Sequence, residues 1–433
     1  MIRKKRMGKG IAKILSGLLV FGMVAGLVPA VPGGTVNAKA TEINGQNATA
    51  EPHTHCVCGT GNLSVERHTH KEETWTGISK LSDINREGNY YLTQDVTLTS
   101  AWTCQRNVNL CLNGHSITRT AKEYYDQNGN NAVIIIKNNV DFTLTDCKGT
   151  GTITHKQGVS GEGVYNDGRF FMYNGIIFGN NGGVKNPGMF FMYGGTITSN
   201  TANNGGGVDN AGTFTMDGGT ITSNTANNGG GVYNDNAGRF IMYGGTITGN
   251  KAEQTYGTEY GGGVYNQGTF NMYGGEITNN TATVGGGGVF NKGTFTMSGG
   301  EITSNSSESY GGGVCYSSSQ LFKMSGTVNI TENKVGTTPN NLYLWNGQQV
   351  SASGLTSGAE IGVTTQIVPI NDSSVPITSD SVSVNCFSSD KSDYETAIDE
   401  NSKVVLKTKT AVEAPSITKQ PQPVSVKVGE TAT

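Results

Sequence analysis

The chain has 433 residues and a formal net charge of −3, and only 15% of its residues are charged. This length is enough for more than one module with a sizeable core, and the charge balance argues against a strongly basic, nucleic-acid-binding protein. The 64 glycines far exceed average usage, and their fixed places in a repeat favour a structural role over disorder.

Residues 1–40 have the organisation of an export signal. Basic residues up to Lys13 precede the apolar stretch 14–31, and Ala38-Lys39-Ala40 has the small residues of a cleavage site. The alternative is an uncleaved membrane anchor, but glycines and Pro29 interrupt the stretch. Cleavage after Ala40 leaves 23 basic and 33 acidic residues, a net charge of −10. We therefore expect a secreted or cell-surface protein whose mature chain does not insert into a membrane or bind nucleic acid.

A polar leader, residues 41–83, concentrates histidine and cysteine. Such a cluster is able to bind zinc, although the C-x-C spacing is not the usual one for a zinc site. A flexible leader without metal remains the alternative, and no other cofactor is indicated in this segment. The candidate metal ligands are His53, His55, Cys56, Cys58, His68 and His70.

Residues 84–157 are expected to form irregular coils that cap the N-terminal end of a repeat array. Leu110 and Leu112 alternate in the way that the later repeats do. Cys111 and Cys147 each lie six residues before an isoleucine, which would place them in neighbouring coils. Alignment on the leucines instead moves Cys147 into a corner, so the pairing of these cysteines stays open.

Seven copies of the pattern F-x-M-x-G-G-x-[IV], or a near variant, lie within residues 158–333. The copies follow one another at intervals of 20 to 30 residues, which is the range of a solenoid. A second element, G-G-V-x-N or a close relative, precedes each copy. The Phe and Met pairs are Phe170/Met172, Phe190/Met192, Phe214/Met216, Phe240/Met242, Phe270/Met272, Phe295/Met297 and Phe322/Met324.

Alternation within each copy predicts short strands. Phe and Met lie two residues apart, so a strand points both to one face, and Gly-Gly suits a sharp corner because glycine readily adopts a positive φ. Each coil of about 24 residues should hold three short strands, stacked as parallel neighbours about 4.8 Å apart. The sequence therefore predicts an all-β parallel β-helix with columns of Phe, Met and Ile inside.

Asparagine recurs eight residues after the methionine in six copies. Stacked side-chain amides at one position of successive coils are able to bond to each other along the column. The predicted ladder consists of Asn180, Asn200, Asn224, Asn250, Asn280 and Asn305.

The motifs G-G-[TE]-I and G-G-G-V-Y-N resemble the repeats of right-handed, pectate-lyase-like β-helices over roughly residues 90–350. The resemblance is particularly to adhesin and autotransporter-type passenger proteins such as the chlamydial polymorphic membrane proteins. It implies a right-handed helix. This fold carries polysaccharide lyases, hydrolases and non-catalytic adhesins alike, so the resemblance does not decide between these functions.

The pattern fades after Val328, and residues 334–410 are expected to form terminal coils and a β-rich cap. A linker begins at Ala411, and the segment from Pro415 to Thr433 is similar to the first strand of a bacterial immunoglobulin-like module. One strand cannot form a sandwich, so residues 411–433 are interpreted as a linker and the truncated start of such a module.

One pair of acids suggests catalysis. Glu276 and Glu301 occupy the G-G-x-I column in consecutive coils, where other coils have threonine. Two carboxylates one coil apart would have a separation near that of a retaining glycosidase. The alternative is a solvated column in which water screens the like charges. Lyases of this fold need acidic residues around calcium, so calcium is the metal that a lyase function would imply.

Outward aromatic columns indicate binding. Tyr233, Tyr265 and Phe290 follow the GGV valine in three consecutive coils, and a second column contains Tyr173, Tyr193, Tyr243 and Tyr273. Exposed rings in a row are able to stack on sugars or on a partner protein, or merely on one another. The longest corner, residues 251–260, is expected to form a lip with the next corners. The aromatic residues of this lip are Tyr256 and Tyr260, from the longest corner, and Tyr310, from a later corner.

These features together favour a binding or adhesion protein that recognises a polysaccharide or a surface glycoprotein. The alternative is a carbohydrate-active enzyme, either a polysaccharide lyase or a glycoside hydrolase.

Overall fold

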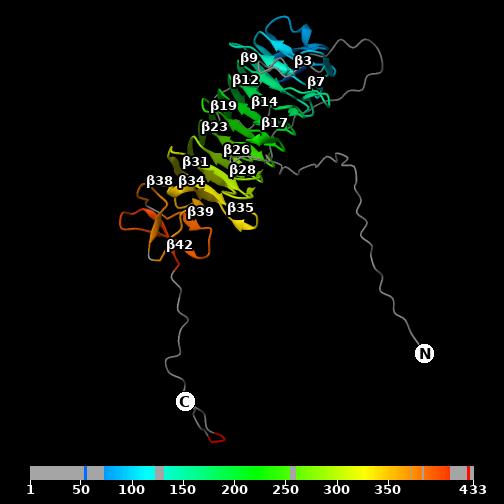
Figure 1. The fold of residues 1–433 in the computed structure, drawn as a ribbon. Coiled ribbons are helices and arrows are strands. Elements are labelled where there is room, and N and C mark those ends of the chain that lie inside the picture. The colour runs from blue at the N-terminus through cyan, green and yellow to red at the C-terminus, as the bar shows by residue number, and fades with distance from the viewer. Residues whose placement is uncertain are drawn as a thin grey trace, which may run out of the picture. The chain divides into compact units, whose positions relative to one another are not determined.

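The structure is a computed structural model that describes residues 53–55, 73–121, 131–253, 260–371, 373–382, 385–409 and 427–429. These residues belong to one compact unit, Ala50–Thr433. The unit is a right-handed parallel β-helix in which strands distant in sequence lie side by side, coil upon coil (Figure 1). The predicted fold class is therefore confirmed. Within the described residues, no helix has the length and apolar character needed to cross a membrane.

Each regular coil contributes one strand to each of three columns. The first column carries the V-x-N element and is called the V-x-N sheet. Its strands are β5 (Trp102–Cys104), β8 (Ile134–Ile136), β11 (Val164–Asn166), β14 (Val184–Asn186), β18 (Val208–Asn210), β22 (Val232–Asn234), β26 (Val264–Asn266), β30 (Val289–Asn291), β33 (Val314–Tyr316) and β37 (Leu342–Leu344).

The second column carries the F-x-M element and is called the F-x-M sheet. Its strands are β2 (Glu73–Ile78), β3 (Gly88–Leu92), β6 (Val108–Cys111), β9 (Asp141–Thr145), β12 (Arg169–Met172), β15 (Met189–Met192), β19 (Thr213–Met216), β23 (Arg239–Met242), β27 (Thr269–Met272), the first parts of β31 (Thr294–Thr303) and β34 (Phe322–Thr331), and β38 (Val350–Leu355).

The third column carries the isoleucines. Its strands are β4 (Val96–Leu98), β7 (Ile117–Arg119), β10 (Thr152–His155), β13 (Ile176–Phe178), β16 (Thr196–Thr198), β20 (Thr220–Thr222), β24 (Thr246–Thr248), β28 (Glu276–Thr278), the second parts of β31 and β34, β39 (Glu360–Thr365) and β41 (Phe387–Ser389). Strand β39 also pairs with β37 of the V-x-N sheet.

Smaller elements complete the fold. A short sheet at one corner contains β17 (Thr201–Asn204), β21 (Thr225–Asn228), β25 (Lys251–Ala252), β29 (Thr281–Ala282), β32 (Ser306–Ser307), β35 (Lys334–Val335) and β36 (Thr338–Pro339). The C-terminal cap is an antiparallel sheet of β40 (Ser374–Pro376), β43 (Val404–Thr408) and β42 (Tyr394–Ile398). Strand β1 (His53–His55) pairs antiparallel with β2, and the two 3-10 helices are η1 (Leu81–Asp83) and η2 (Trp345–Gly347).

The interior consists of stacked identical side chains. Phenylalanines of neighbouring coils lie parallel, with centroid separations of 4.8 Å for Phe214 and Phe240 and 4.4 Å for Phe295 and Phe322. These rings are fully buried, as are the methionines and isoleucines of the regular coils between them. The predicted Phe, Met and Ile columns are therefore confirmed, and Phe142 extends the phenylalanine column toward the N-terminus.

The asparagine ladder is also confirmed, and it is longer than predicted. The side-chain amide of Asn224 donates to Oδ1 of Asn250 at 2.9 Å and to the carbonyl of Ile197 at 3.0 Å. The ladder continues to Asn341, which donates to Asp390 at 2.6 Å. Since every rung is buried, the ladder satisfies backbone groups that the corner would otherwise leave without partners.

A second ladder, which the sequence reasoning missed, runs through the asparagine that ends each V-x-N strand. Asn186 donates to Oδ1 of Asn210, and Asn210 donates to Asn234, both at 2.7 Å. The signal was present in the sequence as the last residue of the repeated V-x-N element.

The Gly-Gly corners have the conformation that their position requires. In the pair Gly244 and Gly245, the second residue has a φ of 82°. A Cβ on the first would lie 2.5 Å from the backbone carbonyl oxygen of Asp217 in the preceding coil. The second position of the pair thus requires glycine for its positive φ, and the first requires glycine because neighbouring coils approach closely there.

Cys111 and Cys147 lie side by side near the N-terminal end. Their Sγ atoms are 3.5 Å apart, so the two cysteines are neighbours without a disulfide between them. The thiol hydrogen bond from Cys111, together with burial, raises the pKa of Cys111. The same bond lowers the pKa of Cys147 to about 7.

Candidate functional site

The first aromatic column lies on the outer face of the V-x-N sheet. Tyr233, Tyr265 and Phe290 stack in register at centroid separations of 5.4 and 5.6 Å. The prediction that these rings are exposed is wrong for two of them, since Tyr265 and Phe290 are only 2% and 5% exposed. They form a second apolar cluster with Cys315 and Tyr343, separate from the main core.

The corner that follows the ladder asparagine accounts for this burial. Gly285, in this corner, lies beside the Phe290 ring, since a Cβ on it would be in van der Waals contact with the ring at 3.5 Å. Tyr310, in the same corner of the next coil, packs against Tyr343 and Trp345 at 5.3 and 4.9 Å. Corner residues therefore cover part of the outer face of the sheet, at Phe290 and Tyr343.

The predicted aromatic lip is not an exposed surface in the described residues. Tyr256 lies outside them. Tyr260 is 1% exposed and packs with Ala252 and Ala282, so its prediction as an exposed ring is wrong. Tyr310 is half-buried against the aromatic rings of the next coil.

The second aromatic column lies on the outer face of the F-x-M sheet and contains two stacked pairs. Tyr173 and Tyr193 are 4.9 Å apart, and Tyr243 and Tyr273 are 5.0 Å apart. Tyr243 and Tyr273 are 52% and 47% exposed, so their predicted outward orientation is confirmed. Asp217, also exposed, interrupts the column between the two pairs.

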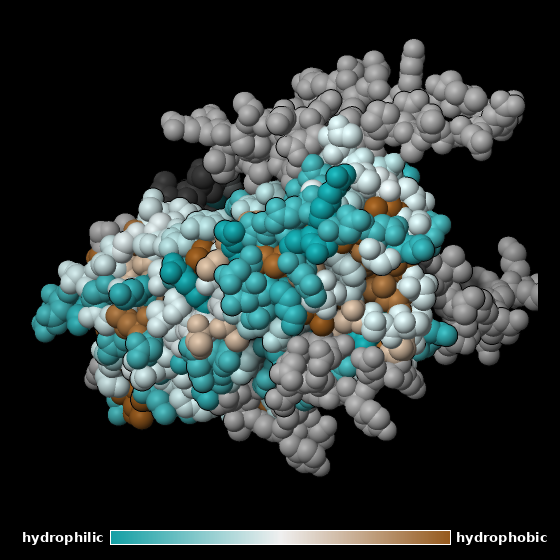
Figure 2. All heavy atoms as spheres, turned by 90° about the horizontal axis from the view of Figure 1, so that it is seen from above, coloured by the Kyte–Doolittle hydropathy of each residue, from teal (hydrophilic) through white to brown (hydrophobic). Residues whose placement is uncertain are grey.

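More apolar side chains lie beside these tyrosines on the same face. Phe171 and Phe191 stack at 5.0 Å, and Met189 is 48% exposed. Apolar residues form small separate patches on a largely hydrophilic surface when the molecule is viewed from above (Figure 2). A solvent-facing group of aromatic rings has no role in filling the core and is typical of a recognition surface.

A polar groove of about 610 Å³ lies on another side of the same coils, between the V-x-N sheet and strands β17 and β21. Glu162, Lys185 and Asp209 line it together with asparagine side chains. Glu162 is 6% exposed, and its Oε2 atom has no hydrogen-bond partner among the described residues.

Burial shifts the pKa values of these two acids. It raises the pKa of Glu162 and raises that of Asp209 to about 6, although the positive charge of Lys185 opposes both shifts. A carboxyl group that titrates near neutrality suits proton transfer. Asp209 is not among the site residues that the sequence predicted. The available signal was the replacement of the tyrosine of V-Y-N by a charged residue in two consecutive coils.

The proposed catalytic pair Glu276 and Glu301 is in register on β28 and β31. Both side chains are exposed, so solvent screens their charges. This placement agrees with the solvated-column alternative.

The predicted metal ligands fall largely outside the described residues. His53 and His55 belong to β1, where His53 pairs with Trp75, but their side chains are not described. Cys56, Cys58, His68 and His70 lie in undescribed segments, so the metal site stays a prediction. Within the described ranges, no three His, Cys, Asp or Glu side chains are grouped to hold a metal ion.

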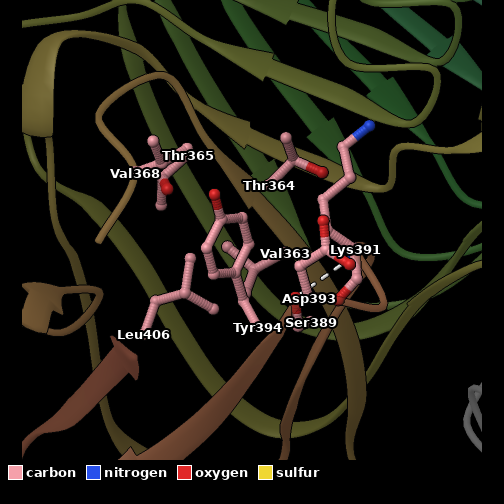
Figure 3. A pocket seen from close by; sticks show the side chains of 9 residues that line it. All are labelled: Val363, Thr364, Thr365, Val368, Ser389, Lys391, Asp393, Tyr394 and Leu406. Atoms are coloured by element: carbon pink, nitrogen blue, oxygen red, sulfur yellow. Dashed lines mark hydrogen bonds between the residues drawn. The ribbon is translucent and has the colours of Figure 1, made fainter. Parts of the chain in front are cut away.

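A second hollow, of about 270 Å³, lies at the C-terminal cap. Figure 3 shows the Tyr394 ring beside Leu406 and Val363, whereas the Lys391 ammonium group points away from them. This cavity has less than half the volume of the polar groove, and Lys391 and Asp393 are the charged residues that line it.

None of the protein-family models, curated proteins or solved structures compared with this chain matches it. The functional assignment therefore depends on the chain's own residues.

Proposed function

We propose that the protein is a secreted or cell-surface binding protein that recognises glycans of a polysaccharide or a surface glycoprotein. The observation that carries this proposal is the exposed aromatic column on the outer face of the F-x-M sheet. Tyr243 and Tyr273 each leave about half of their surface in water, although the fold does not need them for its core. Aromatic rings with a polar rim suit the apolar faces and hydroxyl groups of sugars.

Three features of the sequence support the same proposal. The repeats resemble those of pectate-lyase-like adhesins, the N-terminal 40 residues resemble an export signal, and the C-terminal segment resembles the start of an immunoglobulin-like module. Each is typical of a protein that acts outside the cell.

The double variant Tyr243→Ala/Tyr273→Ala tests the proposal. We expect retention of the protein on a panel of insoluble polysaccharides, including cellulose, chitin and xylan, to fall at least tenfold, because exposed rings contribute more to binding than to stability. Thr269→Ala/Thr294→Ala is a control on the same face without loss of a ring. Unchanged retention of the tyrosine variant would remove the aromatic column from any role in recognition.

The polar groove specifically favours the alternative of a carbohydrate-active enzyme. Glu162 and Asp209 face one groove, and burial raises the pKa of both acids toward the range in which carboxyl groups exchange protons at neutral pH. The enzyme would then use this groove instead of Glu276 and Glu301.

Release of reducing or unsaturated ends from the same polysaccharides tests the alternative. If the groove is catalytic, Glu162→Gln and Asp209→Asn should each lower release at least a hundredfold, whereas Glu276→Gln/Glu301→Gln should not change it. Absence of product with the unaltered protein on every polysaccharide would contradict the enzymatic function.

A further inference from the structure

The outer face of the F-x-M sheet changes character at β19. Large side chains face outward on the two neighbouring strands, β15 and β23, and at the residue that follows each strand. They are Met189, Phe191 and Tyr193 on one side, and Arg239, Ile241 and Tyr243 on the other. On β19 and at its C-terminal end the outward positions hold only Thr213, Thr215 and Asp217, which we call the β19 row.

The register makes the β19 row a break in a regular array. Met192 pairs with Met216 and Met216 with Met242, so the next residues Tyr193, Asp217 and Tyr243 occupy one column. Two coil steps separate the tyrosines by about 10 Å. The ring pairs on either side of the break stack at 4.9 and 5.0 Å. One six-membered ring placed over Asp217 would therefore lie at the normal stacking separation from both tyrosines.

The chemistry of the row is polar between sides that are apolar except for Arg239, which pairs in register with Thr213. The Thr213 end opens into a cavity of about 590 Å³ that Gly188, Gly212 and Met189 also line. At the other end, burial and the negative charge of Asp217 raise the pKa of the Tyr193 phenol. Between them Thr215 offers a hydroxyl group that both donates and accepts.

We propose that the β19 row binds a short stretch of a neutral polysaccharide chain, with one sugar ring held between Tyr193 and Tyr243. This inference rests on the proposed function and assigns its site. A ring between two aromatic faces must be apolar on both faces and polar at its edge, and a pyranose ring meets both conditions. Its edge hydroxyls donate to Asp217 and bond to Thr215. An acidic sugar between Tyr193 and Tyr243 is disfavoured because its carboxylate would face Asp217, whereas Arg239 lies at the Thr213 end of the row.

Completing the tyrosine column tests the site directly. Asp217→Tyr places a ring where four coils of the same column already have one, so the variant should fold and be at least as stable as the unaltered chain. The test uses a polysaccharide that retains the unaltered full chain. We expect the retention of Asp217→Tyr on it to be at least tenfold lower, because the new ring occupies the ligand's position. Thr215→Phe fills the row in the same way, as Phe171 and Phe191 do in their coils.

Ser298→Tyr is the matched control, since it adds a ring to the same column beyond Tyr273 and away from the β19 row. It should leave retention within twofold. Equal retention of Asp217→Tyr, Thr215→Phe and the unaltered chain would overturn the β19 site while leaving the aromatic surface as the binding face. Failure of the unaltered chain to bind any polysaccharide would overturn both the proposed function and this site, and capture of only uronate polymers would overturn its neutral specificity.

Discussion

The outer faces of the V-x-N sheet and the F-x-M sheet carry similar aromatic columns with opposite exposure. Tyr265 and Phe290 on the first sheet are covered, whereas Tyr243 and Tyr273 on the second are half in water. Ring stacking is comparable, with centroid separations of 5.6 Å for the covered pair and 5.0 Å for the exposed pair. On the first sheet, Gly285 and Tyr310 of the corners after the ladder asparagine lie against Phe290 and Tyr343.

The position of a residue in the repeat therefore determines which way its ring points. Whether the ring is exposed to solvent depends on the neighbouring corner. On the V-x-N sheet, Tyr310 and Gly285 come from the corners and close over the column. The rings there act as a small second core. On the F-x-M sheet, the same kind of stack stabilises little and remains available to a ligand.

The largest expected effect separates the covered from the exposed rings. Tyr265→Ala should lower the free energy of unfolding by about 3 kcal/mol, approaching the 3–5 kcal/mol expected for Phe240→Ala in the main core. Tyr243→Ala should lower it by less than about 1 kcal/mol, since its ring is half-exposed. Urea titration of the three variants measures these values. Equal losses for Tyr265 and Tyr243 would mean that the two faces do not differ.

The repetitive interior was predictable from the sequence because it obeys local rules. Alternation placed Phe214 and Met216 on one face, and the fixed spacing of Asn224 from Met216 predicted the ladder. These features depend on strand periodicity and on identical neighbours, both of which are written into the repeat.

The burial of Tyr265 and Tyr260 was not predictable in the same way. It depends on how corners of variable length fold back over a sheet, and no periodic pattern determines such a path. The polar groove has the same origin, since β17 and β21 at the corner form one of its sides. The candidate site thus includes positions where the repeat is interrupted, such as Asp209 and Asp217.

The two outer faces also differ in how far they bury an aspartate. Asp209 lies on the V-x-N face and Asp217 on the F-x-M face, and burial raises the pKa of Asp209 to about 6 from the ordinary value of 3.8. A raised carboxyl pKa means that the fold disfavours the charged form, so stability is lost as the pH rises from about 4 through 6. Asp209→Asn removes that loss.

We therefore expect Asp209→Asn to be more stable than the unaltered protein by about 1–3 kcal/mol at pH 7.5, with the gain disappearing near pH 4. Asp217→Asn should change stability by less than about 0.5 kcal/mol at either pH, since it is an exposed position. Thermal unfolding followed by circular dichroism between pH 4 and 8 gives both profiles. A gain for Asp209→Asn that persists at pH 4 would show that charge burial is not its cause.

The smallest expected effect is a difference in how readily the tyrosine rings react with a chemical reagent, measured without any substitution. Mild treatment with tetranitromethane nitrates tyrosines that solvent reaches, so Tyr243 and Tyr273 should react well before Tyr265 and Tyr260, which are 2% and 1% exposed. Peptide mapping by mass spectrometry at partial modification gives the order.

A polysaccharide that occupies the β19 row should slow nitration of Tyr243, whose ring borders the row, more than that of Tyr273, whose ring is one coil further away. Equal protection of both rings would indicate a ligand that covers the whole column, and early nitration of Tyr265 would show that the corners open in solution and that the two outer faces are alike.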